Sequence, residues 1–122
     1  IYKLPHHCSY LSLAPDKGKT ETTPIENVEW LLAQSKYGAY VVCTSIPIDD
    51  AEQTQPPHFQ SKNTYLRILA GKSGKFKVTM EHPNRITPTR LVIEITDGGA
   101  RLATAASIGT GALVGASGPR VG

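Results

Sequence analysis

The stretch TPIENVEWLLAQSKYGAYVVCTSI, residues 23–46, places one helix directly before one strand and decides the expected fold class. Thr23 is predicted to be the N-cap, with Glu26 three residues later completing a capping box and Pro24 at the first helical position. Apolar side chains then recur at helical spacing, at Ile25, Val28, Leu31 and Leu32. Gly38 is a natural stop after the helix.

Every later element is predicted to be a strand. Residues 39–46, AYVVCTSI, are rich in the β-branched and aromatic residues of a buried strand, and TYLRILA, residues 64–70, predicts another. In KFKVTM, residues 75–80, apolar and polar side chains alternate, which points Lys75 and Lys77 to the same side. RLVIEITDGGARLATAASIGTG, residues 90–111, predicts a hairpin that turns at Asp97-Gly98-Gly99. The expected fold is α+β: one amphipathic helix packed on an antiparallel sheet of four to five strands.

The length of 122 residues predicts a single domain, with an irregular arm over residues 1–22 and a loose tail over residues 111–122. One short strand is expected in the arm, at residues 9–13. The stretch from Leu102 to Gly118 carries no charge but consists mostly of Ala, Gly, Ser and Thr, which is too weakly apolar for a membrane span. We therefore expect no membrane partner.

Charge is divided unevenly along the chain. Residues 1–61 carry four Lys against seven Asp or Glu, whereas residues 62–122 carry nine Lys or Arg against three acids. The second half is thus at +6 and the first at −3. A basic half favours a polyanionic partner, although scattered solvated lysines would give the same count.

The cysteines and histidines indicate no metal or cofactor. His6-His7-Cys8 is the one Cys and His cluster in the sequence, but adjacent histidines point apart and no CxxC motif accompanies them. Cys8 and Cys43 make an even count that would be expected to pair in a secreted protein. Cys43 also lies in the apolar run YVVC, where a buried free thiol is the alternative.

Four stretches resemble the small fungal guanyl-specific ribonucleases and, more closely, the RNase-like secreted effectors of powdery mildew fungi. They are Tyr2 with Cys8, the helix TPIENVEWLLAQ, the strand AYVVC, and YLRILAGKS followed by TRLVIEITDGGARLATAASIGTG. Together they cover about half of the chain. The family's second cysteine, near the C-terminus, has no counterpart after Cys43. The resemblance implies a ribonuclease-like arrangement of the helix and the sheet.

The residues that cleave RNA in those ribonucleases are missing here. Where the resemblance places a histidine beside Tyr40, the chain has Val41 and Val42, and where it places the glutamate base the chain has Arg67. The closing histidine falls at Ser107, Ile108 or Gly109. Losing the base and the acid removes two factors of roughly 10² to 10⁴ each, so we expect no catalytic residue and no RNA cleavage.

The function that the resemblance implies is that of a secreted, non-enzymatic effector of the avirulence type. Such a protein would act as a monomer in the plant cell cytoplasm or nucleus, by binding a host protein, an intracellular immune receptor among them, or host RNA. The candidate phosphate contacts are Arg67, Lys72, Lys75, Lys77 and Arg90. Two alternatives stay open: an active ribonuclease using displaced residues such as His58 or His82, and a bacterial envelope interaction domain.

Overall fold

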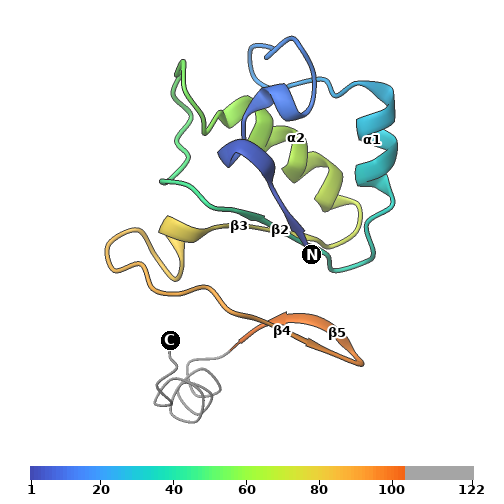
Figure 1. Ribbon diagram of the computed structural model, residues 1–122, viewed down its shortest axis with the longest axis vertical. Helices are drawn as coiled ribbons and strands as arrows, with labels where there is room; N and C mark the ends of the chain where they lie inside the picture. The colour runs from blue at the N-terminus through green and yellow to red at the C-terminus, as the bar shows by residue number, and fades with distance from the viewer. Residues whose placement is uncertain (104–122) are drawn as a thin grey trace. The chain divides into compact units, whose positions relative to one another are not determined.

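The structure, a computed structural model, describes residues 1–103, so the tail predicted for residues 111–122 and positions 107–109 lie outside the described residues. The chain divides into two compact units, residues 1–89 and residues 90–122. The first holds two α-helices and a three-stranded parallel sheet, and the second holds a two-stranded antiparallel sheet (Figure 1). The predicted α+β class is confirmed.

The sheet of the first unit is parallel. Its strands are β1 (Tyr2–Lys3), β2 (Tyr40–Cys43) and β3 (Lys75–Val78), in the order β1-β2-β3. The strands predicted in residues 39–46 and 75–80 are confirmed at their centres, and β3 ends where Thr79–Glu81 turn into a 3-10 helix. The predicted antiparallel sheet of four to five strands is wrong. A helical connection returns the chain to the same end of the sheet before each new strand, so that the strands run parallel.

The first helix, α1 (Glu26–Ala33), confirms the prediction but begins later than expected. Ile25 is the N-cap and no side chain caps the helix, so the predicted capping box of Thr23 and Glu26 does not form. Val28 and Leu32 pack against the core. Ile25 and Leu31, expected on the same apolar face, are largely exposed because eight residues make only about two turns.

The second helix, α2 (Phe59–Ala70), replaces the strand that was predicted at residues 64–70. Its buried side chains are Gln60, Ser61, Thr64, Tyr65 and Leu69. Three of these five are polar, so hydrophobic periodicity does not reveal the helix. Figure 1 shows α1 and α2 on the same side of the sheet. No helix within residues 1–103 has the length and apolarity to cross a bilayer.

Several polar side chains of α2 bond the segment that precedes α1. The side-chain amide of Asn63 donates to the carbonyl oxygen of Thr20 at 2.7 Å, and the Thr64 hydroxyl donates to that of Thr22. The backbone N–H of Thr22 returns a bond to the Gln60 carbonyl at 3.2 Å. Buried polar groups are costly unless they are paired. The Gln60 amide donates to the Lys19 carbonyl at 3.2 Å and to the Glu52 carboxylate at 2.8 Å, whereas the buried Ser61 hydroxyl has no hydrogen-bond partner.

Residues 1–22 also contribute side chains to the core, among them Leu4, Cys8 and Leu13. Besides β1 they contain two 3-10 turns, Pro5–His7 and Tyr10–Ser12, and the second stands where a strand was predicted at residues 9–13. The Ser9 hydroxyl accepts the N–H of Leu11 at 3.2 Å, which starts this turn in place of a strand. The apolar cluster between helices and sheet consists of Leu4, Cys8, Leu13, Val41, Cys43, Ile48, Tyr65, Leu69 and Val78.

The second unit contains the predicted hairpin. β4 (Ile93–Thr96) pairs with β5 (Gly99–Leu102), and the turn lies at Asp97-Gly98. Gly99 has φ +112°, which a residue with a side chain adopts with strain. Glu94 and Arg101 face each other across the strands and form an ion pair at 2.8 Å. The hairpin thus carries its own cross-strand stabilisation.

Gly74 tests the packing of α2 on the sheet. A Cβ at this position would collide with Cδ2 of Leu69 and lie 3.1 Å from the Ala39 carbonyl oxygen. We expect Gly74→Ala to lower the free energy of unfolding by about 1–3 kcal/mol through overpacking. Gly71→Ala is the matched control, since nothing lies within 4 Å of its added Cβ, and it should leave stability unchanged or slightly raised. Urea denaturation measures both, and equal effects would contradict the packing described here.

Candidate ligand site at the carboxyl edge of the sheet

The loops that follow β1 and β2 meet at one edge of the sheet. Because the strands are parallel, their carboxyl ends lie together, which is where ligands commonly bind in open α/β sheets. The N–H of Leu4 extends the β1 pairing by donating to the Val42 carbonyl at 2.8 Å. His7 Nδ1 then bonds the carbonyl oxygen of Thr44, the first residue after β2. This contact fastens the first loop to the second.

The first loop has an unusual backbone. His6, His7 and Cys8 have φ values of 49°, 54° and 66°, so three consecutive non-glycine residues are left-handed. Each such residue costs roughly 1–2 kcal/mol relative to its favoured conformation. Ser73 is the one other non-glycine residue with positive φ within residues 1–103. Strain concentrated in this way is typical of functional loops.

His58 supports the strained loop from the residue before α2. Its N–H donates to the Cys8 carbonyl at 3.1 Å, and its Nδ1 accepts the N–H of Tyr10 at 3.3 Å. Its Nε2–H donates to the Thr54 carbonyl at 3.1 Å. Only 3% of this residue is exposed, and its ring meets the Tyr10 ring edge-on with centroids 5.1 Å apart. Every polar group of the imidazole is thus used in holding the loop.

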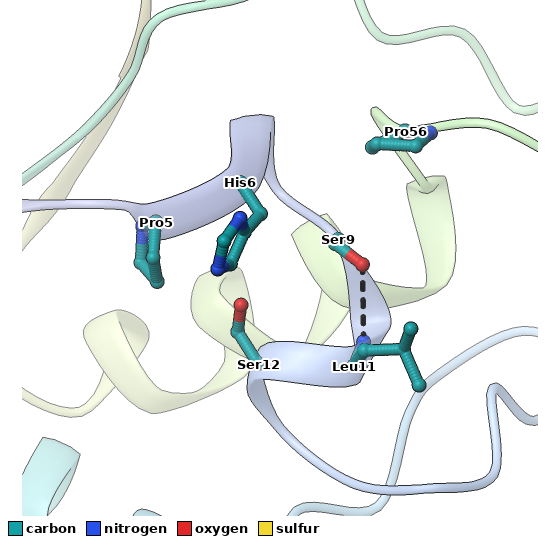
Figure 2. A pocket seen from close by; sticks show the side chains of 6 residues that line it. All are labelled: Pro5, His6, Ser9, Leu11, Ser12 and Pro56. Carbon is teal, nitrogen blue, oxygen red and sulfur yellow. Dashed lines mark hydrogen bonds between the residues drawn. The ribbon is translucent and has the colours of Figure 1, made fainter.

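A hollow of about 550 Å³ opens beside the loop (Figure 2). Its lining residues are Pro5, His6, Ser9, Leu11, Ser12 and Pro56. The Ser12 hydroxyl extends toward the His6 ring, as Figure 2 shows. This hydroxyl oxygen is buried and has no hydrogen-bond partner. The hollow therefore offers one imidazole and one unsatisfied hydroxyl among apolar surfaces.

The cysteines lie beneath this edge as free thiols. Cys8 and Cys43 are both completely buried in the same apolar cluster. A hydrogen bond from Cys8 lowers the pKa of the Cys43 thiol to about 7, against the opposing effect of burial. The same bond, together with burial, raises the pKa of Cys8 far above its ordinary range. Pairing of the two as a disulfide stays a prediction.

No group of three or more His, Cys, Asp or Glu side chains within residues 1–103 is arranged to hold a metal ion. His6 and His7 are neighbours on the loop, but His7 turns its Nδ1 to the Thr44 carbonyl.

The basic residues proposed to contact phosphate are spread over α2, the turn after it, β3 and the second unit. Arg67 lies on α2, where its guanidinium bonds Glu21 at 2.6 Å and Glu29 at 2.9 Å, and these partners raise its pKa. Lys72 donates to the carbonyl oxygens of Ala33 and Ser35 at the end of α1. Arg90 belongs to the second unit. The strand predicted at residues 64–70 would place Arg67 on a sheet, and this prediction is wrong because Arg67 is helical.

Lys75 and Lys77 do lie on one face of β3, as their alternation with Phe76 and Val78 predicted. Strand register adds Lys3, since Lys3 pairs with Val42 and Val42 pairs with Lys77. The ammonium of Lys75 stands 5.7 Å from the centroid of the Tyr40 ring. We call Lys3, Lys75 and Lys77 the basic face. Lys3 was missed because two residues are too short a strand to show alternation.

Comparison with known proteins returns nothing for this chain: no protein-family model, no curated protein and no solved structure matches it.

Strain at His6 can be measured directly. His6→Gly removes the left-handed cost at a position whose side chain makes no hydrogen bond in the described structure, so we expect the free energy of unfolding to rise by about 0.5–1 kcal/mol. Ser73→Gly, at φ 49°, should gain less, because it also removes the hydrogen bond from the Ser73 hydroxyl to the Tyr37 hydroxyl at 3.0 Å. His82→Gly, at φ −108°, should instead lose stability. Chemical denaturation gives all three values, and a loss at His6 like that at His82 would refute the strained conformation.

Proposed function

We propose that the first unit is a ligand-binding domain whose site is the hollow at the carboxyl edge of its sheet. The observation that carries this proposal is the run of left-handed residues from His6 to Cys8 beside the hollow. Glycine would be more stable than histidine or cysteine at such left-handed positions. The cost of the loop is explained if its shape presents His6 to a ligand.

The lining residues favour a ligand with an anionic head and an apolar body. His6 and Ser12 supply an imidazole N–H and a hydroxyl, which both donate to a carboxylate or phosphate oxygen. Pro5, Leu11 and Pro56 supply apolar contact, and Leu11 is 66% exposed at the rim. None of the six lining residues is acidic, so a cationic ligand would find no counter-charge in the lining.

Phenyl phosphate is a suitable probe because it joins a phosphate to a flat apolar ring. We expect it to shift the backbone amide NMR signals of His6 and Ser12 and the imidazole signals of His6. Phenol, which lacks the phosphate, should give weaker shifts. Ser12→Ala should raise the Kd about two- to tenfold, the value of one hydrogen bond. Ser35→Ala is the matched control, since its hydroxyl is also buried and unpartnered but lies after α1. Shifts that are absent, or equal effects of the two serine variants, would refute the site.

The basic face supports a second candidate function, the binding of a polyanion such as RNA. Lys3 and Lys75 are exposed, and no hydrogen bond or ion pair occupies the ammonium of Lys3 or Lys77 among the described residues. Phosphates bind such groups with release of counterions. In the non-enzymatic effector that the sequence resemblance implies, the ligand would be host RNA, held without being cleaved.

Fluorescence anisotropy of a labelled single-stranded RNA, at several salt concentrations, tests this second candidate. We expect the Lys3, Lys75 and Lys77→Gln triple variant to weaken binding and to lower the salt slope by about two units, at roughly 0.7 per phosphate contact. The Arg67 and Arg90→Gln double variant is the control, and it should leave the slope nearly unchanged. The reverse result would refute the basic face, and degraded RNA would refute non-enzymatic binding.

A further inference from the structure

The strongest unassigned feature of the molecule is the pair of buried thiols. Cys8 ends the strained loop after β1, and Cys43 is the last residue of β2. Both have no exposed surface and belong to one apolar cluster, and each thiol shifts the pKa of the other. The Cys8 thiol itself donates to the His58 carbonyl oxygen at 4.0 Å. The bond from the Leu4 N–H to the Val42 carbonyl brings the two segments together. Such proximity across the sheet edge is the requirement for a disulfide.

The two sulfurs are chemically unequal. Cys43 Sγ lies 3.2 Å from the Ser45 hydroxyl, and the positive potential of His7 and Lys3 acts on it. These contacts, added to the bond from Cys8, lower the pKa of Cys43 to about 7. Cys8 has the opposite shift, because of its interaction with Cys43 and its burial. These surroundings favour the thiolate at Cys43 and the protonated thiol at Cys8.

We propose that Cys8 and Cys43 are a redox modification site that closes to a disulfide with hydrogen peroxide and reopens with thiol reductants. The inference is independent of the ligand site and of the basic face. It rests on the shared burial of the two thiols and on their unequal surroundings.

The reaction balances in two steps. The Cys43 thiolate attacks one peroxide oxygen and the O–O bond breaks, which oxidises Cys43 to the sulfenic acid. The departing hydroxide takes up a proton and becomes water. Cys8 sulfur then attacks the Cys43 sulfur, the S–S bond forms and the S–O bond breaks. The departing hydroxide leaves as water with the Cys8 proton. Two thiols and one peroxide thus give one disulfide and two waters.

Peptide mapping gives the primary test. The full chain is treated with hydrogen peroxide, quenched with catalase, unfolded in acid, alkylated and digested with trypsin. We expect a loss of about 2 Da and a linked pair of peptides, residues 4–17 with residues 37–62, both reversed by dithiothreitol. Two alkylated cysteines, a disulfide-linked dimer, or sulfinic acid without a link would each overturn the proposal.

The pH dependence tests the assignment of the nucleophile. With the pKa of Cys43 near 7, the initial rate should rise about tenfold between pH 6 and pH 8, in step with the thiolate fraction. In Cys8→Ser the sulfenic acid on Cys43 should persist and be trapped by dimedone, whereas Cys43→Ser should give no adduct on Cys8. Circular dichroism establishes that each variant is folded. A flat pH profile in the wild-type chain, or trapping on Cys8, would overturn the assignment.

Discussion

The hydrogen bonds from α2 to the backbone of residues 17–22 hold the first unit together. They bind a segment without regular structure to a helix that lies more than 40 positions later in the chain, at separations of 41 to 43 residues. Once that segment is fixed, the residues before it have only a short path to the sheet, and those after it enter α1. Leu4, Cys8 and Leu13 can then complete the core.

The fold was predictable where side-chain patterns report burial directly. α1 shows apolar helical spacing, β2 is a continuous apolar run, β3 alternates, and the hairpin has a glycine turn. α2 was missed because its buried face contains the polar residues Gln60, Ser61 and Thr64. Gln60 and Thr64 bond carbonyl groups of residues 19 and 22, a pairing that no sequence pattern displays. That single error also reversed the sheet direction, since a strand at residues 64–70 leaves no crossover between β2 and β3.

In the candidate site, too, some features were predictable from the sequence and others were not. The sequence placed Lys75 and Lys77 on one face, but it could not show that Arg67 is engaged by Glu21 and Glu29 from two other segments. His6-His7-Cys8 was visible as a cluster, yet its position at a sheet edge depends on β1, a strand of two residues. Three consecutive left-handed residues have no distinct sequence signal here, because glycine is the usual marker of such backbone and the run His6-His7-Cys8 contains none.

Lys72 links the end of α1 to a later part of the chain. α1 has only eight residues, too few to persist alone, and its first turn has no side-chain cap. The ammonium that serves its last carbonyl groups comes from the turn between α2 and β3, and the same turn accepts the N–H of Gly38 at 2.7 Å. The earlier helix in the sequence is therefore completed by the later one. Residues 1–58 alone therefore lack the positive charge that stands at the C-terminal end of α1.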